Sequence, residues 1–145
     1  MFNQASKIAS AILEFDRAVP LMVNDMGQTA LNHFTQSFRD QGFTDETKKA
    51  WPGRKRQRDN GRAILVKSGN LRKLRKQNIG KYKARILTNI ASREYASVHN
   101  NGERSGRGRG FNMPKRQFMG HSKLMERKIK SKIIKVNIEI IPDRD

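Results

Sequence analysis

The stretch IASAILEFDRAVPLMVNDMGQTALNHFTQSF, residues 8–38, decides the fold, because large apolar residues recur in it every three or four positions. This spacing places them on one face of a helix. The residues of this apolar stripe are Ile8, Ile12, Phe15, Val19, Val23, Met26, Ala30, Phe34 and Phe38. Pro20 lies inside the stripe and Gln41-Gly42 follows it, so we expect two stacked helices or one kinked helix that stops there. We predict that the stripe packs into the core; the binding of a partner is the alternative.

Turn signals divide the chain downstream of the stripe. Residues 43–62 look irregular, residues 71–88 favour a β-hairpin that turns at Gly80, and a short helix follows that ends before Asn101. Residues 102–112 contain repeated Arg-Gly pairs that cannot build a core. We therefore predict a mobile basic loop over this segment.

The C-terminal part predicts a helix followed by a strand. Ser122 is suited to cap a helix. This helix would carry Leu124, Met125, Ile129 and Ile133. The alternation of Val136, Ile138 and Ile140 with polar residues then predicts a final strand, which Pro142 closes. The predicted fold class is α+β, with N-terminal helices packed on a small antiparallel sheet, a C-terminal helix and a final strand.

Length and charge set the broad class. The 145 residues fit a single domain over residues 1–145. The net charge is +18, yet residues 1–47 carry three basic and six acidic side chains, against 28 and seven in the remainder. A surface this basic favours an anionic partner. The chain has no cysteine and no apolar run that would span a membrane, and its first residues do not resemble a secretory signal.

The sequence favours a binding protein over an enzyme. The three histidines, His33, His99 and His121, form no metal-ligand motif, and no nucleotide- or cofactor-binding motif occurs. Glu94 with His99 is the one acid–base pair to weigh, and its spacing is a weak signal. We expect no catalysis and no cofactor. The candidate contacts to an anionic partner are Arg54, Lys55, Arg56, Arg58, Arg104, Arg107 and Arg109. A basic nucleic-acid-binding protein is the alternative function.

Three ordered segments resemble the phage virion-morphogenesis family of tail completion proteins. Residues 65–72, Leu-Val-Lys-Ser-Gly-Asn-Leu-Arg, are similar to its L-x-x-S-G-x-L-R segment. Residues 95–102, Tyr-Ala-Ser-Val-His-Asn-Asn-Gly, are similar to Y-A-x-I-H-x-x-G. Residues 113–120, Met-Pro-Lys-Arg-Gln-Phe-Met-Gly, are similar to I-P-x-R-P-F-L-G. The order of these segments, rather than any one of them, carries the resemblance.

The resemblance implies a structural role in phage assembly. Its motif residues, expected to build the scaffold, are Trp51, Ser68, Gly69, Leu71, Tyr95, Ala96, His99, Gly102, Pro114, Arg116, Phe118 and Gly120. It implies tail completion or head–tail joining without catalysis, in the host cytoplasm during assembly and in the virion afterwards. It further implies phage tail or connector proteins as partners, a ring of six copies on assembly and contact with DNA in the channel.

Overall fold

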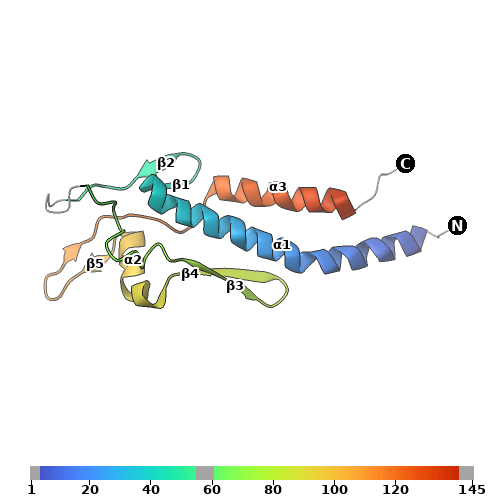
Figure 1. Cartoon of the computed structure of the whole chain (residues 1–145), viewed down its shortest axis with the longest axis horizontal. Coiled ribbons are helices and arrows are strands. Elements are labelled where there is room, and N and C mark those ends of the chain that lie inside the picture. Colours follow the sequence, from blue (N-terminus) through green and yellow to red (C-terminus); the bar gives the residue numbers. More distant parts are fainter. Residues whose placement is uncertain (1–3, 55–60, 141–145) are drawn as a thin grey trace.

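A long N-terminal helix runs along most of the molecule. The structure, a computed structural model, describes residues 4–54 and 61–140. Helix α1 spans Gln4–Asp40 and includes Pro20, and Figure 1 shows it bending in its blue N-terminal half. Of the two predicted arrangements, the single helix is therefore confirmed. A proline inside a helix removes one backbone hydrogen bond and crowds the preceding turn, which bends the axis. The helix stops where predicted, because Gln41 adopts a left-handed backbone with φ 52°.

The predicted α+β class is confirmed, and within the described residues its strands form three separate antiparallel hairpins rather than one sheet. Each contains two strands and pairs with no strand of another hairpin. They are β1 (Gly42–Thr44) with β2 (Lys48–Ala50), β3 (Arg75–Ile79) with β4 (Lys83–Leu87), and β5 (Arg104–Ser105) with β6 (Phe111–Asn112). The hairpin around Gly80 is confirmed. The prediction that residues 43–62 are irregular is wrong at β1 and β2, and the segment expected as a mobile loop contains the β5–β6 ladder.

The two later helices lie where the sequence predicted them. The short turn η2 (Ile90–Ser92) leads into α2 (Arg93–Asn101), which ends one residue later than predicted. Helix α3 spans Lys123–Ile140. Its predicted cap is confirmed, because the Met125 amide donates to Ser122 Oγ over 3.1 Å.

The predicted final strand is wrong, because residues 136–140 continue helix α3. Val136 follows Ile133 by three positions, a spacing that also fits one face of a helix. Both side chains lie beside Met22 and Met26 of α1. No strand within the described part of the chain pairs with this segment. An extended conformation of this segment would therefore lack a neighbouring strand among the described residues to pair with.

Helix α1 is the central element, with α3 along one side and the β3–β4 hairpin along another. Helix α3 runs antiparallel to α1, because the Leu124 amide at its start donates to the Asp45 carbonyl just beyond the end of α1. Gly27 allows α1 to approach the hairpin, since a Cβ there would lie 2.8 Å from the Ala84 Cβ. The absence of a side chain at Gly27 thus sets the distance between α1 and the β3–β4 hairpin.

The core lies at the C-terminal end of α1. Its buried cluster consists of Phe38, Trp51, Leu71, Ala96 and Phe118. The aromatic rings of Phe38 and Phe118 lie 5.1 Å apart, and those of Phe38 and Trp51 lie 5.5 Å apart at a steep angle. The ring contacts join three segments that are distant in the sequence, and Leu71 and Ala96 add two more to the cluster.

The apolar stripe is only partly covered. Its last two members, Phe34 and Phe38, are buried as predicted, whereas Ile8, Ile12 and Phe15 are exposed. The core prediction is therefore wrong for the first part of the stripe. Figure 1 shows the cause, because the start of α1 reaches past the ends of α3 and of the β3–β4 hairpin.

Candidate functional site

Several motif residues meet around Trp51. We call this contact between Trp51, Leu71, Ala96, Arg116 and Phe118 the junction. The indole Nε1 of Trp51 donates to the Gln117 carbonyl over 2.6 Å. Leu71 and Ala96 complete the buried cluster with Phe118, which is 1% exposed. The three resembling segments therefore converge in space around Trp51, although they lie between 14 and 69 residues after it in the sequence. This placement supports the scaffold role predicted for these four residues.

Arg116 ties the junction together through its guanidinium group. Its Nε donates to the Pro52 carbonyl and its Nη2 donates to the Gly53 carbonyl, each over 3.0 Å. The side chain is 7% exposed. Burial, with a smaller contribution from the charge of Arg54, lowers the pKa of Arg116 from its ordinary value. Arg116 thus fixes the turn after Trp51.

Helix α2 holds the other side of the junction. Asn100 Oδ1 accepts hydrogen bonds from the Phe118 and Met119 amides over 2.9 Å and 3.0 Å. Gly102 ends α2 with φ 76°, and its amide donates to the Val98 carbonyl over 3.0 Å. A Cβ at Gly102 would lie 2.9 Å from the Lys115 Cβ. The glycine is needed for both reasons.

The sequence analysis missed the role of Asn100 although it lies inside the second resembling segment. A polar side chain four positions after the buried Ala96, and therefore on the same face of α2, was the available signal.

The remaining motif residues lie around the junction without joining its hydrogen bonds. Ser68 and Gly69 form the turn before Leu71, with Gly69 at φ 71°. Pro114 is half-buried, and Gly120 adopts φ 149° just before the cap of α3. These positions fit a role in shaping loops.

A pocket of about 530 Å³ opens beside the junction. Its lining combines apolar and polar side chains. They are Arg54, Ile64, Leu65, Lys67, Ser68, Leu71, Tyr95, His99 and Arg116. The pocket brings together residues from all three resembling segments, so it is a candidate contact site.

His99 lies half-buried in this pocket. The Tyr95 ring packs edge-on against it at 6.1 Å. Burial, followed by the charge of Arg116, lowers the pKa of His99 below 6.5. The Nδ1 atom is buried and has no hydrogen-bond partner among the described residues. Glu94 is exposed and makes no contact with His99 in the described part of the chain, so the acid–base pair that the sequence suggested is not assembled.

The singled-out basic residues that the structure describes lie in two places, beside the pocket and on the β5–β6 hairpin. Arg54 donates to the Arg62 and Ala63 carbonyls over 2.8 Å and faces the pocket. Arg104, Arg107 and Arg109 lie on the exposed β5–β6 hairpin, where Arg104 Nη2 donates to the Arg109 carbonyl. The predicted contacts at Lys55, Arg56 and Arg58 lie outside the described residues.

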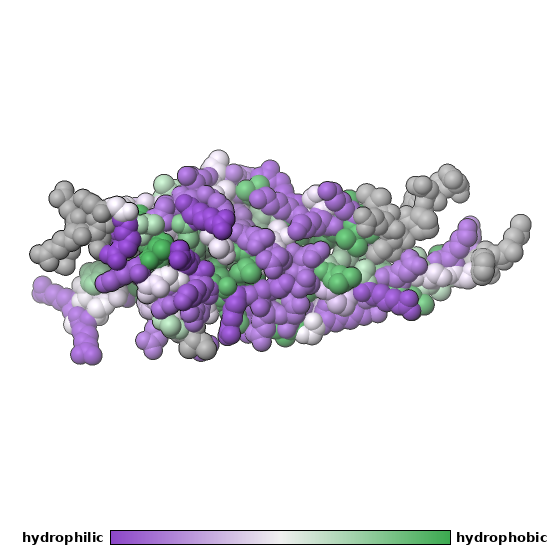
Figure 2. Space-filling model, viewed as in Figure 1, coloured by the Kyte–Doolittle hydropathy of each residue, from purple (hydrophilic) through white to green (hydrophobic). Residues whose placement is uncertain are grey.

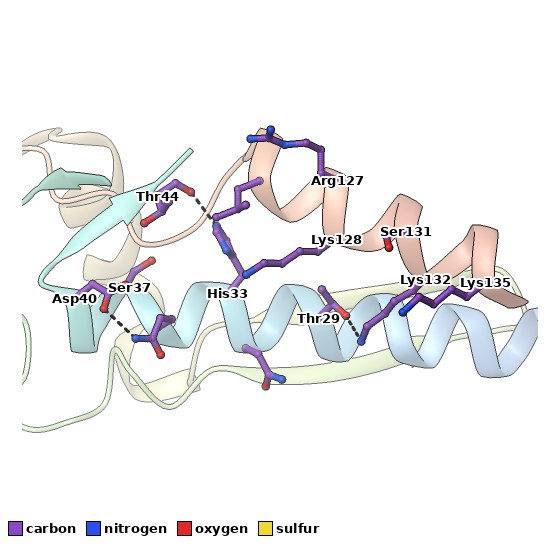
Figure 3. A pocket seen from close by; sticks show the side chains of 13 residues that line it. Thr29, His33, Ser37, Asp40, Thr44, Arg127, Lys128, Ser131, Lys132 and Lys135 are labelled. Carbon is purple, nitrogen blue, oxygen red and sulfur yellow. Dashed lines mark hydrogen bonds between the residues drawn. The ribbon is translucent and has the colours of Figure 1, made fainter. Parts of the chain in front are cut away.

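The structure reveals a second basic surface, which the sequence analysis missed. A groove of about 820 Å³ lies between α1 and α3. Figure 3 shows Lys128 of α3 extending toward His33 of α1 and Lys132 toward Thr29. The cations that line this α1–α3 groove are Arg127, Lys128, Lys132 and Lys135. Lys128, Lys132 and Lys135 are spaced by four and three, so a correct helix prediction through residue 136 would have placed them on one face.

The groove is polar on both walls. Lys132 Nζ donates to Thr29 Oγ1 over 2.8 Å, and the ring Nε2 of His33 lies 3.0 Å from the Thr44 carbonyl oxygen (Figure 3). Burial lowers the pKa of His33 below 6.5. Asp40 is the one carboxylate in the lining, and the Gln36 amide donates to it over 2.9 Å. The arrangement is suited to an anionic ligand or surface.

Neither metal chemistry nor a membrane span has support in the described chain. Within residues 4–54 and 61–140, no three His, Cys, Asp or Glu side chains are placed to hold a metal ion. Over the same residues, no helix has the length and apolar character that a membrane crossing requires.

Comparison with known proteins identifies the family. No curated protein and no solved structure matches the chain. The profile of the phage virion morphogenesis family matches residues 2–136, which is nearly the whole sequence and includes every segment of the junction. That family consists of structural proteins of phage assembly. The chain belongs to the phage virion morphogenesis family.

Proposed function

We propose that this protein completes the phage tail and prepares it for joining to the head, as a non-catalytic component. The observation that carries the proposal is the family match over residues 2–136. The motif residues are consistent with it, because Trp51, Arg116 and Phe118 act in packing and in holding backbone carbonyls. A part of this kind works through its surfaces, so its partners are tail or connector proteins at the head–tail junction.

The α1–α3 groove supports docking on an acidic protein surface. Four cations line it against one carboxylate. Complementary charge steers association and fixes the orientation of partners. In the assembled particle the protein forms a ring of six copies on such a surface, and other basic side chains of the ring face the DNA channel.

Deletion of the gene tests the assembly role. The expected result is an accumulation of complete heads and separate tails, seen by electron microscopy of gradient fractions. Purified protein added to the mutant lysate should restore infectious particles. Infectious particles at the normal yield from the deletion strain would contradict the proposal.

Two matched triple variants test the docking surface. Lys128→Gln, Lys132→Gln and Lys135→Gln together should weaken binding to isolated tails by about tenfold or more and reduce its salt dependence. The control variant removes the same amount of charge from the β5–β6 hairpin through Arg104→Gln, Arg107→Gln and Arg109→Gln. It should weaken binding to isolated tails less. Equal effects would assign the binding to net charge alone. Tight, salt-resistant binding of the protein to naked DNA would instead favour a nucleic-acid-binding function.

A further inference from the structure

Arg116 is a buried cation without a negative partner in the described part of the chain. It is 7% exposed, and the ion pairs within residues 4–54 and 61–140 do not include it. Burial lowers its pKa, and the neighbouring charge that contributes, that of Arg54, is also positive and lowers it further. A buried charge that lacks an opposite charge opposes folding. A bound anion would remove this penalty.

The guanidinium group of Arg116 has donors left for such an anion. A guanidinium carries five N–H groups in one plane. The hydrogen bonds to the Pro52 and Gly53 carbonyls use two of them, and the other three have no acceptor within the described residues. Arg116 also lines the pocket of about 530 Å³, which we call the Arg116 pocket. Planar guanidinium groups bind carboxylates through two parallel hydrogen bonds, so the pocket offers a carboxylate a matching partner.

The rest of the lining fits an anion as well. Arg54 and Lys67 belong to the lining, and no Asp or Glu among the described residues does. His99 indicates that the site is incomplete, because its ring Nδ1 is buried and has no hydrogen-bond partner in the described part of the chain. The α1–α3 groove differs, since its cations share the groove with the carboxylate of Asp40. The described lining of the Arg116 pocket thus selects a ligand that brings its own negative charge.

The aliphatic part of the lining indicates that a protein carries the anion. Ile64, Leu65 and Leu71 line the Arg116 pocket beside the cations. Leu65 holds a left-handed backbone with φ 61°, which leucine rarely adopts, and strain of this kind concentrates at ligand sites. A phosphate group has nothing apolar to place against this wall, whereas a protein segment presents a carboxylate beside a leucine or isoleucine side chain. We propose that the Arg116 pocket binds a partner protein through one carboxylate and a neighbouring aliphatic side chain, with Arg116 holding the carboxylate.

A small probe tests the pocket in the free, full-length protein. 4-Methylpentanoate is suitable, because it joins one carboxylate to one branched aliphatic chain. In proton–nitrogen NMR spectra at constant ionic strength it should shift the amide signals of Ser68, Leu71 and His99, with a Kd of about 1–10 mM. Unchanged signals of these residues at about 100 mM probe would overturn the proposal.

Three further compounds separate the chemical groups of the probe. 4-Methylpentanamide lacks the charge and acetate lacks the aliphatic chain, so each should bind at least about tenfold more weakly. Equal binding of either compound would overturn the part of the proposal that it tests. Inorganic phosphate should also bind more weakly. Tighter binding of phosphate at the same signals would overturn the protein partner and favour a nucleic-acid ligand.

Two matched charge reversals test the location of binding. Lys67→Glu and Lys73→Glu both replace exposed lysines, but only Lys67 lines the Arg116 pocket. Lys67→Glu should raise the Kd of 4-methylpentanoate by about fivefold or more, because it places a like charge beside the carboxylate. Lys73→Glu should raise it by less than about twofold. Equal effects of the two variants would show that net charge attracts the probe and would overturn the site.

Arg116→Lys tests the central residue, since lysine keeps the charge and loses the planar group. It should weaken binding of 4-methylpentanoate by about tenfold in a protein whose NMR spectrum remains that of a folded chain. Wild-type affinity in the folded variant would show that Arg116 does not hold the carboxylate. If the variant fails to fold, the pair at positions 67 and 73 still decides. This inference adds a partner contact to the proposed assembly function, and loss of binding here would leave that function to the gene deletion.

Discussion

Single polar side chains hold the loops of this protein onto its core. Arg116, Asn100 and Trp51 each direct side-chain atoms at backbone groups of another segment. Buried carbonyl and amide groups need such partners, because the loss of one leaves a desolvated group unpaired. The junction therefore depends on a few residues more than its small apolar cluster suggests.

Replacement of Arg116 tests this dependence. Arg116→Ala removes the donors to the Pro52 and Gly53 carbonyls, and we expect the free energy of unfolding to fall by about 2–3 kcal/mol. Urea denaturation measures the change. The control Arg107→Ala, on the exposed β5–β6 hairpin, should change stability by less than about 0.5 kcal/mol. A similar small effect of Arg116→Ala would contradict the proposed role.

The two half-buried histidines make stability depend on pH. Burial lowers the folded-state pKa of His33 and of His99 below 6.5. The unfolded chain then binds more protons than the folded chain near this pH, so stability is complete above about pH 6.5 and falls as the pH drops through it. Urea denaturation should give a lower free energy of unfolding at about pH 5.5 than at about pH 7.5.

The variant carrying both His33→Gln and His99→Gln is the control for this pH dependence, because it has no imidazole at either position. It should show a smaller difference between the two pH values. A wild-type protein equally stable at both pH values would contradict the lowered pKa values of the two histidines.

At the scale of elements, α1 is the helix against which α3 and the β3–β4 hairpin pack. Its close approach to the hairpin depends on Gly27, opposite Ala84. Glycine within a helix ordinarily weakens it relative to alanine by about 1 kcal/mol. Here tertiary packing reverses that preference.

Replacement of Gly27 by alanine shows which effect wins. Gly27→Ala should destabilise the protein by about 1–3 kcal/mol, because the new methyl group crowds the rigid Ala84 Cβ. Thermal unfolding measures it. At Gly53 a Cβ meets nothing within 4 Å, so Gly53→Ala should have little effect. If Gly27→Ala raised the Tm, helix propensity would dominate and the close packing of α1 on the hairpin would be wrong.

At the scale of the molecule, net positive charge opposes compactness. The chain carries +18 charges, and Figure 2 shows hydrophilic side chains over most of the visible body. In the α1–α3 groove, Lys128, Lys132 and Lys135 lie on one wall with little acid opposite. Repulsion of this kind is screened by salt.

Added salt should therefore stabilise the free protein. Raising NaCl from about 50 mM to about 500 mM shortens the Debye length about threefold. We expect the Tm to rise by about 3–5 °C, as for a gain of about 1 kcal/mol. The variant with glutamine at positions 128, 132 and 135 should show a smaller rise in scanning calorimetry. A Tm that falls with salt would mean that attractive ion pairs dominate.

The sequence by itself determined the elements whose signals are local. The 3.6-residue period of α1, the turn at Gly80, the Ser122 cap and the glycine that ends α2 each depend on neighbouring residues. The resemblance of three ordered segments also indicated the family, since motif order survives without any knowledge of contacts. Charge and composition indicated a binding role, because they too are read from the sequence without any knowledge of contacts.

Only the tertiary structure decided what depends on distant partners. Residues 136–140 alternate like a strand, yet they continue α3, with Val136 beside Met22 and Met26 of α1, and no strand in the described part of the chain pairs with them. One apolar stripe is core at Phe38 and exposed at Ile8, since α3 and the β3–β4 hairpin cover only part of α1. Periodicity reports which face of an element is apolar; whether that face is buried depends on which other elements reach it.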